Sequence, residues 1–361
     1  LVSSSAASDV YKRQAVGANS LIKLTTGTDN TVVGLNAGDS MTTANRNVAI
    51  GYFALAEAVD TNDTVAIGRY AMGAGDVAND GQVAIGRNSL AELTSGAGNT
   101  AIGYNSGRTL TTGASNVAVG YDAMSNAHLG CDKNVVIGRG ALYNGEVDEA
   151  VFIGFNAGGD GTTTTAANGA VGVGKSSLNN VTSAQRMTAV GFGALKTEDA
   201  GGYQTAVGYE ALAQVNNDNG HNTALGQRAG YTLTGGYSNT LIGSATAASS
   251  VNAINQTVVG MGATGVANNS VTLGGSSVTA IYAAQDSGAT IYAAGLVEGS
   301  SMTLKENIGE IESPLDKLTK LRGVEFDYKS TKERSIGMIA EEVNEVFPES
   351  VSYTHLTLPT S

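Results

Sequence analysis

Residues 47–54 read N-V-A-I-G-Y-F-A, and variants of this stretch occur fifteen times along the chain, about every 17 residues. In each copy a short apolar run leads into a glycine. These glycines are Gly34, Gly51, Gly68, Gly86, Gly103, Gly120, Gly138, Gly154, Gly174, Gly191, Gly208, Gly226, Gly243, Gly260 and Gly274. A short, fixed period indicates one structural unit stacked many times, so the sequence predicts a rod.

The residues just before each glycine predict a short strand. Val, Ile or Leu stands directly before every glycine, and Val or Thr stands three positions before it. The residue between these two positions is never charged, so we expect both faces of the strand to be buried. Each coil is expected to hold two short strands and two turns. Burial of both faces requires a partner, and the simplest one is an identical copy, with three chains around an axis.

Two further positions of the repeat predict the corners of the coil. Ala, Ser or Thr lies three residues after every glycine, which predicts a tight corner. Asn or Gln lies four residues before the glycine in ten of the fifteen copies. Amides stacked at one corner can hydrogen-bond along the rod as a ladder.

The repeat resembles the head repeats of trimeric bacterial adhesins, the YadA-like heads, in N-V-A-I-G-Y-F-A (47–54) and N-S-V-T-L-G-G-S (269–276). Its longer spacing is more similar to head-type repeats of phage tail fibres. The resemblance covers roughly residues 27–278. It implies an all-β fold, a left-handed parallel β-roll or β-solenoid of about 15 coils of ~17 residues, assembled as a homotrimer.

The segment after Ser300 has another composition and carries three motifs in order. They are L-K-E-N-I (304–308), L-R-G-V-E-F-D-Y-K (321–329) and G-M-I-A-E-E-V-N-E-V-F-P-E (337–349). They resemble the intramolecular chaperone domain of endosialidase-type tailspikes, peptidase family S74. The resemblance implies a domain that trimerises a fibre and then releases itself, with Ser300 as nucleophile and Lys305 as base. The family often has Asp where this chain has Ser301, so an uncleaved assembly domain is the alternative.

Local patterns predict the elements of this C-terminal segment, a small and incomplete α+β domain. Ser313 followed by Pro314 predicts a helix start with a serine cap. Residues 323–328 alternate as a strand, and residues 335–340 begin another. Residues 341–346 are expected to form a short helix before Pro348.

The two ends of the chain break every pattern. Residues 4–14 read S-S-A-A-S-D-V-Y-K-R-Q and residues 351–360 read V-S-Y-T-H-L-T-L-P-T. Both are translations of one double-stranded oligonucleotide that resembles a transposase-type sequencing adapter, and such segments are left out of fold reasoning. We expect the gene to continue in both directions, and the shortened chaperone domain to cleave poorly. The domains are adapter (1–14), repeat rod (15–278), β neck (279–299), partial chaperone domain (300–350) and adapter (351–361).

Composition narrows the classes of partner and chemistry. The net charge is −12, with 32 acidic and 20 basic residues, which disfavours nucleic acid and anionic membranes as partners. No apolar run approaches the ~20 residues that span a bilayer, so no membrane insertion is expected of this segment. Cys131 is the sole cysteine, and His128 and His221 lie far apart in the sequence, without a cluster of other metal ligands. No cofactor or metal is predicted.

Gly169–Ser176 matches the phosphate-loop pattern G-x-x-x-x-G-K-S. In a true phosphate loop the pattern opens a helix. Here Gly174 is a repeat glycine, and the next repeat glycine follows 17 residues later, which leaves no room for that helix.

The position directly after each glycine predicts a stripe of long side chains on one corner of the rod. From the second copy on, aromatic or basic residues fill this position in consecutive coils. Aromatic faces bind sugars and arginine binds carboxylates, so the stripe is a candidate glycan contact; ordinary packing between coils is the alternative. The residues are Tyr52, Arg69, Arg87, Tyr104, Tyr121, Arg139, Phe155, Lys175, Phe192 and Tyr209.

The first functional hypothesis is a structural and receptor-binding phage tail fibre or appendage in the virion tail, with a host-surface glycan or protein as partner. Its enzymatic activity would be at most a single self-cleavage. The alternatives are a trimeric adhesin on the bacterial surface and a glycan-degrading tailspike.

Overall fold

The computed structural model describes residues 13–73, 80–127, 130–159, 167–183, 185–199, 201–217, 219–281, 309, 311–327 and 334–348. The chain divides into two units, Leu1–Tyr282 and Ala283–Ser361. Of the predicted neck (279–299), only residues 279–281 are among the described residues.

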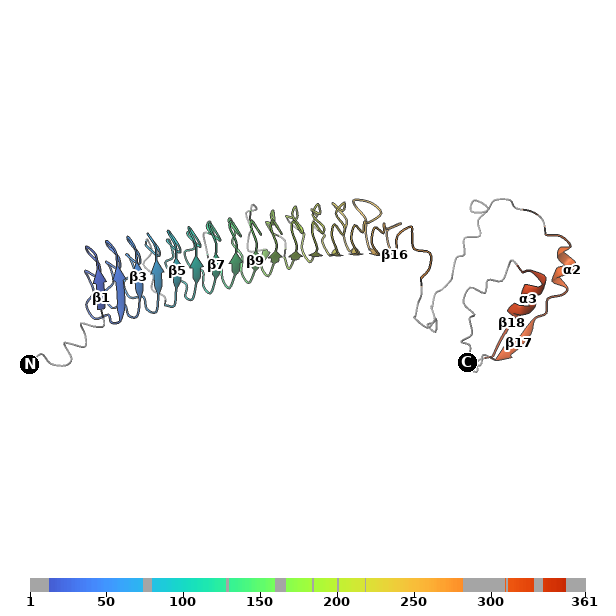
Figure 1. Ribbon diagram of the computed structural model, residues 1–361, viewed down its shortest axis with the longest axis horizontal. Coiled ribbons are helices and arrows are strands. Elements are labelled where there is room, and N and C mark those ends of the chain that lie inside the picture. Colours follow the sequence, from blue (N-terminus) through green and yellow to red (C-terminus); the bar gives the residue numbers. More distant parts are fainter. Residues whose placement is uncertain are drawn as a thin grey trace, which may run out of the picture. The chain divides into compact units, whose positions relative to one another are not determined.

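The first unit is one parallel sheet of sixteen strands, in which each strand pairs with the next along the chain (Figure 1). This confirms the predicted β-solenoid. Most of the strands are three residues long. They are β1 (Arg13–Val16), β2 (Asn30–Val33), β3 (Val48–Ile50), β4 (Val65–Ile67), β5 (Val83–Ile85), β6 (Thr100–Ile102), β7 (Val117–Val119), β8 (Val135–Ile137), β9 (Val151–Ile153), β10 (Val171–Val173), β11 (Thr188–Val190), β12 (Thr205–Val207), β13 (Thr223–Leu225), β14 (Thr240–Ile242), β15 (Gln256–Val259) and β16 (Ser270–Leu273).

The register of the sheet follows the sequence period. Val48, Ala49 and Ile50 of β3 lie opposite Val65, Ala66 and Ile67 of β4, and the same alignment holds along the sheet. The first strand, β1, adds a sixteenth copy that ends before Gly17, and Arg13 of β1 lies opposite Asn30 of β2. The sequence did not predict this copy, because Arg13 and Gln14 belong to the segment interpreted as adapter and Gln14 stands where the other copies have Val or Thr.

The two faces of each strand differ from the expectation that both are buried. The middle residue of the strand is the one that faces the interior, and Ala49, Ala66 and Ala84 are fully buried. The Val, Thr, Ile and Leu residues on either side face outward and stay half-buried or exposed, as in β6 and β8. The interior of so thin a coil has room for a small side chain, which is why alanine is the inward residue in most coils.

In the described residues the remainder of each coil is mostly turn and bend, with isolated bridges such as Asn45–Asn62, rather than the second strand that we predicted. The second and fourth residues after the glycine adopt left-handed backbone conformations, as at Phe53 (φ 54°) and Leu55 (φ 51°). The Phe53 N–H donates to the Leu35 carbonyl of the preceding coil, and the Leu55 N–H donates to the Ala71 carbonyl of the next. Backbone hydrogen bonds therefore continue between coils, while the alternating kinks prevent an extended strand.

The predicted amide ladder is present inside the rod. The Asn116 side-chain nitrogen donates to Asn99 Oδ1 (3.0 Å) and to the Cys131 carbonyl (2.5 Å). Asn116 Oδ1 accepts from the side-chain nitrogen of Asn134 (3.0 Å) in the next coil. All three asparagines are at most 1% exposed, so the ladder satisfies polar groups that water does not reach.

The second unit contains two short helices and a two-stranded antiparallel sheet. They are α2 (Pro314–Leu318), β17 (Val324–Asp327), β18 (Arg334–Gly337) and α3 (Ala340–Val346). All four elements lie close to their predicted positions. The predicted serine cap of α2 is wrong, because Ser313 has a left-handed backbone and its side chain makes no capping hydrogen bond. Neither helix contains a buried residue.

Candidate functional site

The predicted stripe lies along one corner of the first unit and forms a ladder of ring and cation–π contacts on either side of the Arg69–Arg87 step. The rings of Tyr104 and Tyr121 stack at 5.0 Å with an angle of 10° between their planes. The Arg139 guanidinium lies 5.5 Å from the Tyr121 ring centre and 5.8 Å from that of Phe155. Lys175 Nζ is 5.5 Å from the centres of both Phe155 and Phe192.

The ladder continues toward both ends of the sheet. Phe192 stacks on Tyr209 at 5.1 Å. At the other end, Arg69 lies over the ring of Tyr52 (5.6 Å), and Arg87 lies over that of Tyr104 (5.5 Å). The structure thus brings the predicted stripe residues together as cation–π and stacking pairs between neighbouring coils.

The stacking between coils limits how the ladder can contact a sugar. A sugar ring stacks on an aromatic face, and neighbouring coils cover the faces of Tyr121 and Phe155. The ring edges are what solvent reaches, with Tyr121 49% exposed and Phe155 42% exposed. Along this stretch the ladder therefore presents ring edges and cationic groups rather than free aromatic faces.

A hollow opens beside the ladder where a glycine replaces a side chain. It has a volume of about 230 Å³ and lies next to Gly140. The lining residues are Tyr121, Asp122, Arg139, Gly140, Tyr143, Phe155 and Asn156. It combines a carboxylate, an amide, a guanidinium and aromatic rings in one place. Sequence reasoning missed this site: the glycine among asparagines marks the gap in one column, but not the other two columns that complete the hollow.

The phosphate-loop match lies in an ordinary coil. Gly174 directly follows β10, and residues 175–180 form a turn. No helix begins in the described residues between β10 and β11. Among the candidate histidines, the His221 ring stacks on Tyr203 at 5.1 Å, and His128 lies outside the described residues.

Cys131 is a buried thiol inside a corner of the rod. Burial raises its pKa to about 11, because the thiolate would lose its hydration there. Its Sγ lies 3.6 Å from the Gly145 carbonyl oxygen. A thiol held in this form is a poor nucleophile.

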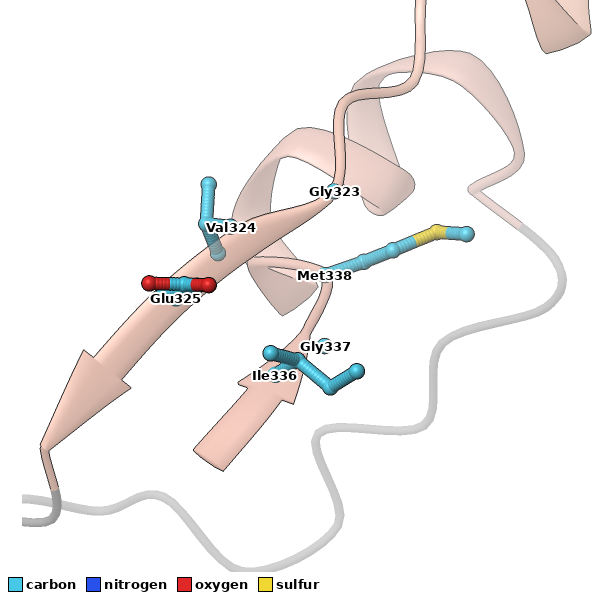
Figure 2. Close-up of a pocket in the computed structure, with 6 residues that line it drawn as sticks. All are labelled: Gly323, Val324, Glu325, Ile336, Gly337 and Met338. Atoms are coloured by element: carbon cyan, nitrogen blue, oxygen red, sulfur yellow. The ribbon is translucent and has the colours of Figure 1, made fainter. Parts of the chain in front are cut away.

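The second unit presents its apolar side chains to solvent. A hollow of about 440 Å³ lies on the β17–β18 hairpin, lined by Gly323, Val324, Glu325, Ile336, Gly337 and Met338 (Figure 2). Ile336 is 77% exposed, and Leu315 of α2 is 75% exposed. Within the described residues, this unit has no core of its own.

Two exposed ion pairs link elements of this unit. Arg322 Nη2 lies 2.6 Å from Glu342 Oε1 of α3, and Arg334 pairs with Glu325 across the hairpin. The hydrogen bond from Arg322 lowers the pKa of Glu342. The predicted dyad, Ser300 and Lys305, lies outside the described residues.

Comparison with protein families identifies this C-terminal segment. Residues 300–352 match the family model of the chaperone of endosialidase, Peptidase_S74. The match covers the three motifs quoted above and includes both Ser300 and Lys305, which supports our interpretation of the chaperone segment. No curated protein and no solved structure matches the chain.

None of the described helices is long and apolar enough to cross a membrane. In the same part of the chain, no group of three or more His, Cys, Asp or Glu side chains is placed to hold a metal ion.

Proposed function

We propose that this chain is a trimeric, tail-fibre-like attachment protein, in which the β-solenoid is the shaft and the C-terminal chaperone segment brings three chains into register. The match to the chaperone of endosialidase supports the assembly role. The sixteen-stranded solenoid supports the role of the shaft.

The observation that carries the proposal is the outer face of the sheet. Its two outward columns consist of Val, Ile, Leu and Thr in all fifteen predicted copies, without a charge. At 4.7–4.9 Å per strand these columns extend for roughly 70 Å. In the single chain Ile50, Ile102 and Ile137 remain exposed to solvent. Parallel sheets are generally covered on both faces, so this face requires a cover.

A second copy of the chain fits this face best. The columns repeat in register with the strands, so an identical rod offers the same apolar side chain at every level. Apolar residues that face each other between rods would bury area without leaving a charge unpaired. Three copies around an axis would cover the face of each.

The chaperone segment would then release itself by a serine–lysine mechanism, as the family resemblance implies. Lys305, held neutral by its surroundings, would take the hydroxyl proton of Ser300. The Ser300 oxygen would attack a main-chain carbonyl at the start of the segment, and the peptide bond would break as Lys305 returns the proton to the departing amine. Water would then hydrolyse the resulting ester. Ser301 lies beside the proposed nucleophile, so replacing it shows whether loss of cleavage is specific to Ser300.

Denaturing electrophoresis of the protein tests this step. Two fragments are expected from the wild type, and one band each from Ser300→Ala and Lys305→Ala. Ser301→Ala should still yield two fragments. A wild type that remains intact would refute self-cleavage while leaving the trimeric shaft in place.

A further inference from the structure

The second position after each repeat glycine forms a column of its own beside the aromatic ladder. Asn88, Asn105, Asp122, Gly140 and Asn156 occupy this column in consecutive coils, all with φ between 52° and 63°. The side-chain nitrogen of Asn88 donates to Asn105 Oδ1, and that of Asn105 donates to Asp122 Oδ1, each at 3.0 Å. This outer amide ladder stops at Gly140, which has no side chain to continue it.

The interruption creates the hollow described above. Its volume of about 230 Å³ is smaller than the ~300–1,000 Å³ of sites for drug-sized ligands. It is therefore suited to one small ring. Asp122 and Asn156 bound it from the two adjoining coils, and Arg139 bounds it from the ladder.

Tyr143 supplies the aromatic wall that the ladder itself lacks. Tyr143 is 42% exposed, and no stacking or cation–π contact in the described part of the chain involves its ring. The equivalent positions in the adjoining coils hold Ser125 and Gly159, which are too small to cover the ring. The Tyr143 face is thus open where those of Tyr121 and Phe155 are not.

We propose that this hollow binds one neutral hexopyranose unit of a host-surface glycan. Sugar hydroxyls donate to carboxylates and accept from amides and guanidinium groups, and the C–H face of a sugar packs on an aromatic ring. Asp122, Asn156, Arg139 and Tyr143 provide these four contacts. The Asp122 carboxylate disfavours an acidic sugar at the same place. The inference rests on the proposed attachment role for its biological setting, but the hollow lies within a single chain.

Filling the missing position provides the sharpest test. In Gly140→Asn the new amide could donate to Asp122 and accept from Asn156, and asparagine tolerates this left-handed conformation better than most residues. A Cβ at this site would lie 2.6 Å from Asn156 Oδ1, the end of a side chain that can rotate away. The variant is therefore expected to fold with unchanged or higher stability while losing the hollow.

The matched control is Gly193→Asn in the same column. Gly193 has φ 61°, and a Cβ there would make only an ordinary contact with Glu210 at 3.6 Å. Tyr143→Ala is a second probe, because it removes the open ring without filling the hollow.

Binding of glucose, galactose, mannose, N-acetylglucosamine and glucuronate to the full chain is measured by saturation-transfer NMR and titration calorimetry. At least one neutral hexose should bind, with a dissociation constant on the order of 1 mM or below. Gly140→Asn and Tyr143→Ala should each weaken binding by about tenfold or more, and Gly193→Asn by less than about twofold. No binding of any neutral hexose, preference for glucuronate, or unchanged binding by Gly140→Asn would overturn the proposal. The oligomeric state, measured separately, tests the proposed function independently of these results.

Discussion

A Cβ on Gly51 would lie 2.6 Å from the carbonyl oxygen of Gly68 in the next coil. The two backbones approach so closely that only hydrogen fits between them, and the same approach recurs along the column. The Gly51 φ of 135° is also one that residues with a side chain rarely adopt. The glycine of the repeat is thus required by contact between coils as well as by backbone conformation.

Gly51→Ala should destabilise the rod by about 3 kcal/mol or more, because it combines backbone strain with a clash against main-chain atoms that cannot move aside. Gly262→Ala is the control: its φ is 65°, and no atom lies within 4 Å of the added Cβ. There the cost should be about 1–2 kcal/mol, from the left-handed conformation alone. Denaturant unfolding measures both, and equal losses would contradict the close approach of the glycines.

The interior amide ladder predicts a large effect at Asn116. Asn116→Ala leaves buried groups of Asn99, Cys131 and Asn134 without their partner, which should cost about 3 kcal/mol or more. Asn105→Ala breaks the outer ladder, where water can replace the lost bonds, and should cost less than about 1 kcal/mol. Similar destabilisation of the two variants in denaturant unfolding would show that the interior ladder has no special role.

Because the thiol of Cys131 is buried, we predict that the free energy of unfolding falls at alkaline pH. Folding raises the pKa of its thiol from about 9.0 to about 11. Above pH 9 the unfolded chain loses this proton while the folded chain keeps it, so stability falls as pH rises from 9 to 11. Two pKa units correspond to about 3 kcal/mol.

Comparing wild type with Cys131→Ala between pH 8 and 11 isolates this contribution. The difference in unfolding free energy between the two proteins should shrink as the pH rises. Iodoacetamide should also modify Cys131 only in denaturant. Rapid labelling of the folded protein would contradict a buried thiol.

The outward columns of the sheet predict where charge disrupts assembly. Ile102→Glu places a carboxylate in the middle of the apolar face and should separate the chains without unfolding the coil, because Ile102 is 37% exposed in the single chain. Val251→Glu is the control, at a site 48% exposed that lies in a turn. Light scattering should show a smaller particle for Ile102→Glu alone, and dissociation by Val251→Glu would argue against a specific interface.

The sequence allowed the period, the parallel stacking and the interior amides to be predicted, because each leaves a column that can be read along the chain. It could not show which strand face lies inside, since Val48, Ala49 and Ile50 are all apolar. The size of the side chains decides which face lies inside, because the interior has room for a large residue only where its neighbours are small, as at Phe152. This inward ring fits because its neighbours Gly158 and Gly172 lack side chains that would occupy the same space.

The candidate sites also differ in whether the sequence alone could predict them. The aromatic ladder could be predicted from one column, because every member stands directly after a repeat glycine. The hollow at Gly140 could not, since it depends on three columns meeting at one corner and on the small size of Ser125 and Gly159 beside Tyr143. The chaperone segment could be predicted from its motifs, and its dyad of Ser300 and Lys305 remains a prediction.

The mass of the native particle tests the central claim most directly. Light scattering coupled to size-exclusion chromatography should give the mass of three chains for the wild type and of one chain for Ile102→Glu. A wild type with the mass of a single chain would contradict the account, because the apolar face of the sheet would then be stable in water without a partner.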